Sequence, residues 1–351
     1  DRPAGRGIEG ARCPRRLSAA ARVFGRLPAP HAARLSPDDP VAGLEVGKVR
    51  DVVPPDGRHD WSVVEVGAAA LNHHDLWSLK GVGLPAELLP MVLGTDAAGV
   101  VETPAGRQEV VVWPVVGATG HGAGPEERRS ILSEKYPGTL AERVAVPTYN
   151  LVPKPAELSF AEAACLPTAW LTAYRMLFVS AALRPGDRVL VQGAGGGVGS
   201  AAVALAATAG LEVVATSRTA AKREHALAAG AAAVLEPGSR LPFRVDAVIE
   251  TVGRATWQHS VKALRPGGTL VVAGATTGDQ PGAELTRVFF NELRVVGATM
   301  GAKEDLEALL RFVVRTGLRP TIDSTWRLAD APSAMARLAS GEHLGKVVVL
   351  P

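Results

Sequence analysis

Cysteine and long apolar runs are both scarce in this sequence. Cys13 and Cys165 are the only cysteines among 351 residues, which leaves no disulfide framework and is typical of a protein from a reducing compartment. No stretch reaches the roughly 18–20 apolar residues that a membrane-spanning helix needs. We therefore expect a cytoplasmic protein with no membrane partner.

Acidic residues are nearly absent from the first 34 residues, where eight arginines face only Asp1 and Glu9. This leader carries +6, so the rest of the chain carries −3 within a total of +3. The mildly acidic body argues against a nucleic-acid partner. We favour an N-terminal extension (1–30) with no function of its own. A mitochondrial transit peptide and a nucleic-acid-binding arm remain alternatives.

The composition of the chain changes near residue 159. Before it, short apolar stretches broken by glycine and proline predict strands, and 117–138 reads as a long loop. After it, apolar strands alternate with helices, which predicts an α/β fold whose doubly wound parallel sheet is covered on both faces. Ser159 and Glu162 have the spacing of a capping box at the start of a helix. The expected helices include 255–268, 303–317 and 331–341, and a last strand covers 345–350.

A glycine-rich turn at 189–210 is the most informative motif. The segment VLVQGAGGGVG joins a predicted strand to a helix that starts near Val198. Gly196 removes a side chain where a pyrophosphate would approach the backbone, and Gly199 lets the helix pack closely on the strand. Free N–H groups at the helix N-terminus favour phosphate. We predict a dinucleotide at Gly195, Gly196, Gly197 and Val198, the alternative being an empty vestigial fold.

The end of the next strand indicates which dinucleotide binds. An NAD-specific site would place an acidic residue there for the ribose hydroxyls. This chain has Ser217, followed by Arg218 and Lys222, and a hydroxyl with two cations suits a 2′-phosphate. We therefore predict NADPH as the cofactor. In the alternative, the two cations are simply solvated charges at the start of a helix.

With these motifs, the chain resembles the medium-chain dehydrogenase/reductase superfamily. The resemblance covers 31–351 and implies a GroES-like, β-rich catalytic domain (31–160 and 297–351) with a Rossmann domain (161–296) between its two parts. The motifs that carry it are AALNHHDLWSLKG, PMVLGTDAAGVV, GTLAERVAVP, LPTAWLTAY, VLVQGAGGGVG, VDAVIETVG, LRPGGTLVVAGATTG and HLGKVVVL.

The resemblance also indicates a branch without zinc. The three positions that hold zinc ligands in the alcohol dehydrogenases of this superfamily are Asn72, Thr95 and Thr168 here, and none is a normal zinc ligand. The structural zinc lobe of those enzymes would fall in 117–138, which contains no cysteine. The chain is therefore similar to the zinc-independent quinone oxidoreductases, and we expect no metal.

The segment AALNHHDLWSLKG puts His73, His74 and Asp75 side by side. Adjacent side chains diverge, so they do not converge easily on one ion. We favour structural histidines over a substrate contact or proton supply, and both over a metal site. Asp75 could cap the helical turn that follows, and Trp77 could line the substrate cleft or pack beneath it. Cys165 reads as a buried thiol rather than a reactive one.

Further site residues follow from the resemblance and from strand ends. Asn72 and Thr172 would lie near the nicotinamide with Thr168 beside it, which makes Asn72, Thr168 and Trp77 the candidate catalytic residues. Lys346 would reach a cofactor phosphate from the tail. The remaining candidates follow Rossmann strands at the ligand-binding edge. They are Thr251, Val252, Ala273, Gly274, Ala275, Met300 and Gly301.

Without zinc, reduction needs a substrate with its own electron sink, such as a quinone, an enone or an enoyl thioester. We therefore expect an NADPH-dependent reductase of such small molecules, acting as a homodimer by the family's habit. A zinc-type alcohol dehydrogenase with unusual ligands and a non-catalytic NADPH-binding or scaffold protein are the alternatives.

Overall fold

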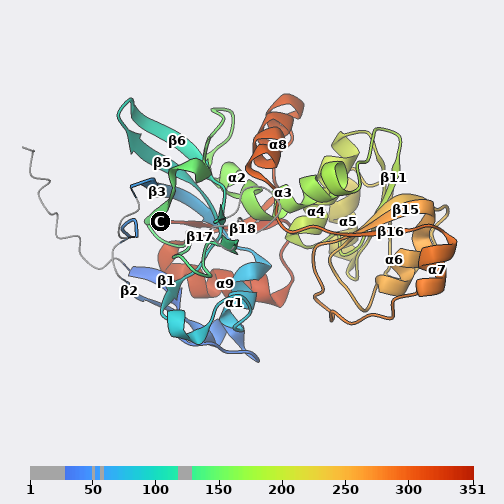
Figure 1. The fold of residues 1–351 in the computed structure, drawn as a ribbon, viewed down its shortest axis with the longest axis horizontal. Helices are drawn as coiled ribbons and strands as arrows, with labels where there is room; N and C mark the ends of the chain where they lie inside the picture. The colour runs from blue at the N-terminus through green and yellow to red at the C-terminus, as the bar shows by residue number, and fades with distance from the viewer. Residues whose placement is uncertain (1–27, 50–51, 56–58, 118–128) are drawn as a thin grey trace, which may run out of the picture.

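The computed structural model describes residues 28–49, 52–55, 59–117 and 129–351 (Figure 1). Nearly all of the expected extension 1–30 lies outside the described residues, and so does 118–128 of the expected loop, with His121. Two lobes lie side by side along the long axis, and α2, α3 and α8 lie between them. These three helices cover Phe160–Ala164, Leu171–Tyr174 and Lys303–Thr316.

One lobe contains a parallel six-stranded sheet in the order β13-β12-β11-β14-β15-β16. The order reverses between β11 and β14, and ligands bind beyond the strand ends at such a switch point. The predicted doubly wound parallel sheet is confirmed. Its strands are β11 (Arg188–Val191), β12 (Glu212–Thr216), β13 (Ala233–Leu235), β14 (Val245–Glu250), β15 (Leu264–Val272) and β16 (Arg294–Gly297).

Both faces of this sheet are apolar. Successive side chains on a strand point to opposite sides, so each apolar strand contributes to both faces. Val189 and Val191 belong to the large core cluster that α4 (Gly197–Thr208) and α5 (Ala220–Ala228) help to form. Leu190 lies between them in sequence but belongs to a separate cluster, which α6 (Trp257–Ala263) covers. The helices therefore bury the sheet from both sides.

The other lobe is β-rich. A seven-stranded sheet runs β10-β6-β5-β3-β18-β17 with β9 also paired to β3, and two small sheets, β2-β1-β4 and β7-β8, lie beside it. The strands are β1 (Pro28–Ala32), β2 (Leu44–Lys48), β3 (Trp61–Ala70), β4 (Met91–Val92), β5 (Asp96–Thr103), β6 (Gly106–Val112), β7 (Val115–Val116), β8 (Ser130–Ile131), β9 (Arg143–Pro147), β10 (Leu151–Pro153), β17 (Ile322–Arg327) and β18 (Lys346–Leu350).

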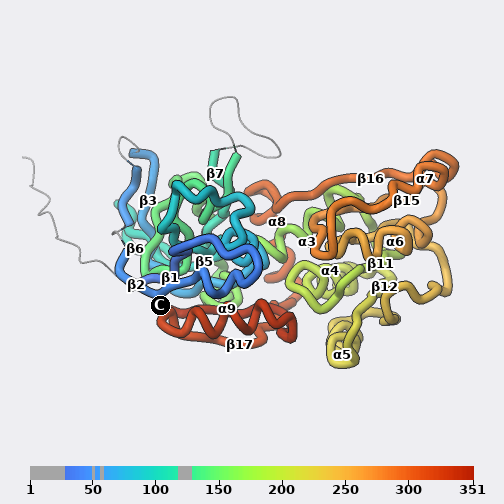
Figure 2. Tube along the Cα trace, turned by 90° about the horizontal axis from the view of Figure 1, so that it is seen from below, coloured from blue at the N-terminus to red at the C-terminus, as the bar shows by residue number. Residues whose placement is uncertain are grey.

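The last strand returns to the N-terminal half. Val348 of β18 pairs with Ala70 of β3, and β17 continues the sheet beyond β18. Helix α1 (His73–Leu79) follows β3, and α9 (Ala331–Ser340) packs against β18. The red C-terminal segment therefore lies against the blue N-terminal one (Figure 2). The residues at which the two domains divide stay a prediction.

Some local predictions are confirmed and others are wrong. Ser159 and Glu162 form the expected capping box, but the helix after it does not stay α-helical. Pro167 lacks an N–H group, and 166–170 and 175–180 adopt wider π-helical turns. The expected helix 255–268 ends at Ala263, where β15 begins. Helix α7 (Leu285–Phe290) was not predicted, because it buries none of its residues. No helix in the described ranges is long and apolar enough to cross a membrane.

Asp323 on β17 ties the C-terminal elements together. It accepts hydrogen bonds from Arg337 Nη2 and the Leu344 N–H, both at 2.9 Å. Burial opposes ionisation, but these bonds and one from Ser324 outweigh it and lower the pKa of Asp323 to about 2. A carboxylate whose pKa falls on folding stabilises the fold above its unfolded pKa of about 3.9, and this stabilisation is lost as the pH falls toward 2.

We predict that Asp323→Asn lowers the free energy of unfolding by about 1–2 kcal/mol at pH 7. The difference from wild type should shrink as the pH falls from 4 toward 2. Urea titrations across this range measure it, with the exposed Asp279→Asn as the matched control. A loss of stability that does not change with pH would contradict the assignment.

Candidate active site

A chain of five polar side chains lies between the two lobes. The Lys346 ammonium donates to Leu71 O at 2.8 Å, to Asn72 Oδ1 at 2.6 Å and to Asp96 Oδ2 at 3.0 Å. Asn72 Nδ2 donates to Thr95 Oγ1 at 3.1 Å, and Thr95 Oγ1 lies 2.9 Å from Thr168 Oγ1. The first four side chains are buried and Thr168 is partly exposed. The sequence-predicted Asn72, Thr168 and Lys346 thus meet at one place.

Local structure holds Asn72 and Thr95 in position. Asn72 is the N-cap of α1, and its N–H donates to Asp75 Oδ2 at 2.8 Å. The other Asp75 oxygen accepts from the Gly94 N–H at 3.0 Å. Burial raises the pKa of Asp75. Asp75 was expected to cap the turn that follows it, but it lies inside α1, three residues after the N-cap, and its carboxyl group instead caps the Asn72 N–H. The same carboxyl group also fixes the turn that leads into Thr95.

The glycine-rich turn has the shape that a dinucleotide requires. A Cβ at Gly199 would lie 2.3 Å from Gly193 O, so the helix packs on the turn as predicted. A Cβ at Gly196 would meet only Gly193 O, at 3.9 Å, so this face of the backbone is open. The first N–H groups of α4 lack partners within the helix. An open glycine backbone beside a helix N-terminus fits a pyrophosphate.

The glycine turn lies close to Lys346 of the polar chain and to Ala169, the neighbour of Thr168. A Cβ at Gly197 would lie 3.2 Å from the Ala169 Cβ and 3.7 Å from the Lys346 Cδ. Ala169 follows Thr168 in the π-helical turn 166–170. A dinucleotide on this turn would therefore have the polar chain at its side. This contact links the predicted cofactor site to the predicted catalytic residues.

The carboxyl ends of the parallel strands carry a buried polar network. Glu250 accepts from the N–H groups of Val252 and Gly253 at 2.7 and 3.0 Å and from Ser260 Oγ at 2.6 Å. A Cβ at Gly193 would meet Val252 at 2.9 Å and Thr251 at 3.6 Å. Neighbouring backbone contacts bring the other strand-end candidates to the same edge. These candidates are Ala273, Gly274 and Ala275, beside Glu250, Thr251 and Gly253 respectively.

Lys222 lies across the glycine turn. Its side chain would collide with a Cβ at Gly195, at 2.1 Å, and its ammonium donates to Gly341 O at the end of α9. Burial and the charge of Arg218 lower the pKa of Lys222. Ser217 is buried at the end of β12 and Arg218 is exposed beside it. Of the three residues predicted for a 2′-phosphate, Lys222 therefore lies against the glycine turn, and Ser217 and Arg218 directly follow the neighbouring strand β12.

The other predicted residues lie in varied surroundings. Gly301 O accepts from Trp113 Nε1 at 2.9 Å, and a Cβ at Gly301 would lie 2.5 Å from Leu171. Met300 and Thr172 are buried. Trp77 is about one third exposed, with the Lys80 ammonium 5.2 Å from its ring centroid. In the part of the molecule that the structure describes, no hydrogen bond or ring contact joins the Trp77 side chain to the polar chain.

The histidines separate, as their divergent side chains predict. His74 Nε2 lies 3.2 Å from Glu134 Oε1, whereas the His73 ring lies 6.1 Å from that of His343. Burial, followed by the charges of Lys346 and Lys222, lowers the pKa of His73. Burial and the neighbouring His73 lower the pKa of His343 to about 4. Both rings are therefore neutral at pH 7, which fits the structural role that we favoured.

Four residues around the site were not among the predicted site residues. Asp96 and His343 have partners far away in sequence, and Glu134 lies in the segment expected to be a loop. Glu250 ends a predicted strand, and a carboxylate at that position could have signalled a polar strand-end network. Cys165 is buried as expected, and burial raises its pKa to about 12.

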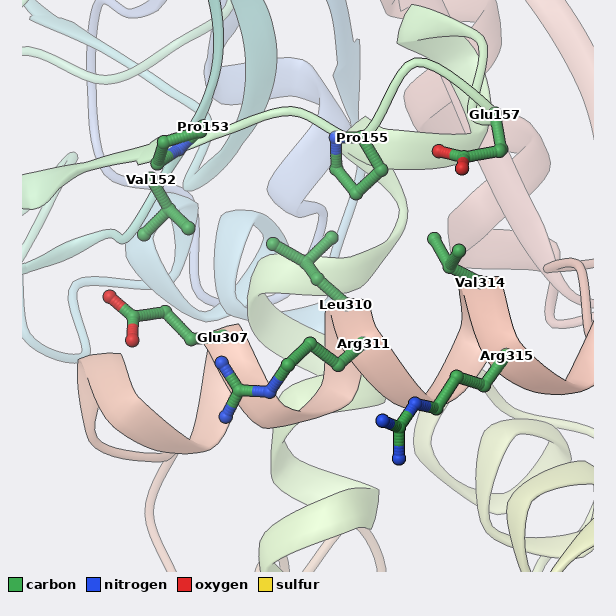
Figure 3. A pocket seen from close by; sticks show the side chains of 9 residues that line it. All are labelled: Val152, Pro153, Pro155, Glu157, Glu307, Leu310, Arg311, Val314 and Arg315. Carbon is green, nitrogen blue, oxygen red and sulfur yellow. The ribbon is translucent and has the colours of Figure 1, made fainter.

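A groove of about 520 Å³ lies elsewhere, between α8 and the chain after β10 (Figure 3). Arg311 and Arg315 border it along α8, and prolines form part of the opposite wall. None of the predicted site residues lines it. The glycine turn, and not this groove, is therefore the candidate active site.

Two family models match the chain. "Alcohol dehydrogenase GroES-like domain" covers residues 58–156, and "Zinc-binding dehydrogenase" covers 197–315. Together they match more than half of the sequence and both lobes of the fold. The chain belongs to the medium-chain dehydrogenase/reductase superfamily.

Curated relatives of this dehydrogenase/reductase include stand-alone enzymes and part of a larger protein. It is 33% identical to a 2-methylene-furan-3-one reductase of Solanum lycopersicum over 316 residues, 86% of this chain and 74% of that one. It is 32% identical to the spectinabilin polyketide synthase system protein NorB of Streptomyces orinoci, over 82% of this chain. The match spans 13% of NorB's length.

Solved structures agree over nearly the whole chain. A structure titled as an NAD-dependent alcohol dehydrogenase matches with a TM-score of 0.81 at 33% identity, over 93% of this chain and 100% of that one. The 2-octenoyl-CoA carboxylase reductase CinF, in complex with NADP and 2-octenoyl-CoA, matches with 0.80 at 25% identity, over 94% and 89%.

One matching family model is named for zinc binding, but the side chains at the corresponding positions of this chain do not fit a zinc ion. At the three resembling positions, Asn72, Thr95 and Thr168 offer neutral amide and hydroxyl groups, whereas zinc binds thiolate, imidazole or carboxylate. These groups hydrogen-bond one another. Of the neighbouring carboxylates, Asp96 is paired with Lys346, and Asp75 accepts from the N–H groups of Asn72 and Gly94. Among the described residues, no three His, Cys, Asp or Glu side chains cluster as a metal site would need.

We predict that Gly196→Val and Gly199→Ala fail in different ways. The first places a side chain in open space, so the protein should fold but bind NADPH and NADH at least about tenfold more weakly. The second forces Gly193 O away and should cost about 2–3 kcal/mol of stability. Thermal unfolding and fluorescence titration separate the two effects. Unchanged dinucleotide binding by Gly196→Val would show that the cofactor does not bind at this turn.

Proposed function

We propose that this chain is an NADPH-dependent, zinc-independent reductase of activated alkenes, above all α,β-unsaturated carbonyl compounds. One observation carries the proposal. Asn72, Thr95 and Thr168 are hydrogen-bonded in series, and Lys346, which bonds to Asn72, and Ala169, which follows Thr168, both lie beside the glycine turn at Gly197. The site thus brings polar hydrogen-bonding groups to a dinucleotide but offers no metal electrophile.

The chemistry follows from these groups. A nicotinamide dinucleotide held at the glycine turn would supply a hydride to the β-carbon of the substrate, the double-bond carbon farther from the carbonyl group. The electron pair of the substrate double bond then moves toward the carbonyl oxygen, where a hydrogen bond can stabilise the charge. A simple alcohol lacks this electron sink and would need a metal. The names of the tomato enone reductase and of CinF point to the same class of substrate.

Selectivity for NADPH rests on Ser217, Arg218 and Lys222. The CinF complex contains NADP, whereas the NAD-dependent alcohol dehydrogenase of similar fold is named for NAD. The position after β12 that would be acidic in an NAD-specific site is Ser217 in this chain. Two cations and a hydroxyl would bind a 2′-phosphate and gain nothing from a ribose hydroxyl.

We predict that Arg218→Ala raises KM for NADPH about 10- to 100-fold, because a charge-assisted bond to phosphate contributes about 1.5–3 kcal/mol. KM for NADH should stay the same, since NADH has no 2′-phosphate. Arg244→Ala is the matched control, because this exposed arginine directly precedes β14 and so lies at the amino end of a strand, whereas Ser217 and Arg218 follow the carboxyl end of β12. Equal losses with both cofactors would refute the phosphate assignment.

Turnover itself is tested with chelator-treated protein, NADPH, and either 2-cyclohexen-1-one or a quinone as acceptor. We expect oxidation of NADPH with the enone and no loss of rate after chelation. A quinone has a comparable electron sink. Reduction of the quinone but not of the enone would make quinones, and not activated alkenes, the substrate class. Activity that requires added zinc would contradict the proposed metal-free chemistry.

We also propose a homodimer that forms through the β16 edge of the parallel sheet. Edge strands expose unpaired backbone groups that favour pairing. Four large apolar residues on α7 and β16 are exposed, and α7 lies at the end of the molecule far from the β-rich lobe (Figure 2). The exposed fractions are 69% for Leu285, 68% for Phe289, 81% for Phe290 and 48% for Val295. A second copy of the chain would cover them.

We predict that Phe290→Asp converts a dimer into a monomer, because a buried unpaired carboxylate disfavours the interface. Leu227→Asp is the matched control, since this exposed leucine lies on α5, away from β16. Light scattering after size exclusion gives the mass of each. A wild-type monomer, or a Phe290→Asp dimer, would rule out this interface.

A further inference from the structure

The polar chain has a direction that its chemistry fixes. An ammonium group can only donate, so the Asn72 atom that faces Lys346 must be the oxygen. The Asn72 amide nitrogen therefore faces the other way and donates to Ala70 O at 3.3 Å and to Thr95 Oγ1 at 3.1 Å. Both amide hydrogens are used. The orientation of Asn72 is thus set by the charge of Lys346.

The next bond in the chain follows from burial. Thr95 is 0% exposed, and its hydroxyl already accepts from Asn72. Its own hydrogen has one partner in the described parts of the molecule, Thr168 Oγ1 at 2.9 Å. A buried hydroxyl that did not donate would cost about 1–3 kcal/mol. Thr95 therefore donates and Thr168 accepts.

Thr168 is left with one unused hydrogen. Helical threonines often donate to the carbonyl four residues back, but Thr168 lies in the π-helical turn 166–170, and no such bond to Ala164 forms. Thr168 is also the one partly exposed member of the chain. Its neighbour Ala169 lies against the glycine turn at Gly197. The free O–H bond is therefore available to a molecule bound beside the dinucleotide.

We propose that the Thr168 hydroxyl donates a hydrogen bond to the substrate oxygen that gains negative charge, and that Lys346 fixes the direction of this donor through Asn72 and Thr95. The substrate's identity as an activated carbonyl compound rests on the function proposed above. In this assignment Thr168 touches the substrate, whereas the other three are positioning residues. No proton leaves Thr168, so the proton for the product carbon comes from solvent.

This assignment changes two sequence-based expectations. Lys346 was expected to contact a cofactor phosphate, but its three hydrogens are directed to Leu71, Asn72 and Asp96. Asn72 was expected near the nicotinamide, but its amide group is committed to neighbours on all sides. Both side chains act on bound molecules through Thr168 in our assignment.

The test uses 4-nitrophenol, whose ionised form absorbs visible light and mimics an oxygen with negative charge. Whole protein with NADP⁺ is titrated with the phenol at fixed pH, and the bound phenolate-to-phenol ratio is measured. We expect the wild type to favour bound phenolate. Thr168→Val, which keeps the shape but removes the donor, should lower the ratio about tenfold or more. Thr168→Ser should restore it.

Asn72→Asp tests the direction of the chain. A carboxylate at position 72 still accepts from Lys346, but it makes Thr95 donate to it, so Thr168 must donate to Thr95. The Thr168 hydroxyl would then lose its free hydrogen. Asn72→Asp should therefore also lower the ratio. In the Thr168→Val background it should have little further effect, whereas a simple effect of added charge would be additive.

The control is Thr103→Val, which removes a hydroxyl from the β5–β6 hairpin. It should leave the ratio unchanged. A wild-type ratio in Thr168→Val, additive effects of the two substitutions, or no binding of the phenol by wild type would each overturn the proposal. Phenolate preference without enone turnover would keep the donor and reject only the proposed reaction.

Discussion

The buried ion pair between Lys346 and Asp96 is the interaction on which the rest of the site depends. The Lys346 side chain is 3% exposed and that of Asp96 is 0% exposed. Burial of two charges is costly unless geometry and further hydrogen bonds compensate, and loss of one partner typically costs about 3–5 kcal/mol. Here Leu71 O and Asn72 Oδ1 complete the ammonium's partners. Since Lys346 begins β18 whereas Asp96 begins β5, the pair also joins the C-terminal tail to the N-terminal half.

From this charge the polarity of the site follows. Lysine cannot accept, so Asn72 presents its oxygen to Lys346 and its nitrogen to Thr95. Neutral hydroxyl and amide groups thereby form a one-way series in place of a metal. The same lysine lies beside the glycine turn, 3.7 Å from where a Gly197 side chain would begin. One buried cation thus organises hydrogen-bond direction and lies next to the dinucleotide turn.

What the sequence predicted well is local in the chain. The glycine turn, the capping box at Ser159 and the short apolar strands each depend on neighbours within a few residues. The failures depend on distant partners or on weak burial. Lys346 bonds to a residue 275 positions away, which no local pattern reveals. Helix α7 has no buried residue, so it lacks the apolar periodicity by which helices are recognised. The π-helical turn at Thr168 depends on Pro167 and on packing against the glycine turn.

The charged residues near Lys222 leave room for a bound negative charge. Burial, followed by the charges of Arg218 and Arg337, lowers the pKa of Lys222, while the charges of Asp323 and Glu342 oppose this shift. Asp323 already accepts hydrogen bonds from Arg337, Ser324 and the Leu344 N–H. These partners offset much of its negative charge, so little of that charge is left to stabilise the Lys222 ammonium. Among the described residues, the hydrogen-bond partner of the Lys222 ammonium is a carbonyl oxygen, that of Gly341. A phosphate bound there would reverse the electrostatic balance, because it would face Lys222 and Arg218 together. The Lys222–Gly341 bond also connects α5 in one lobe with the end of α9 in the other. An anion that binds Lys222 would therefore alter one of the contacts between the two lobes.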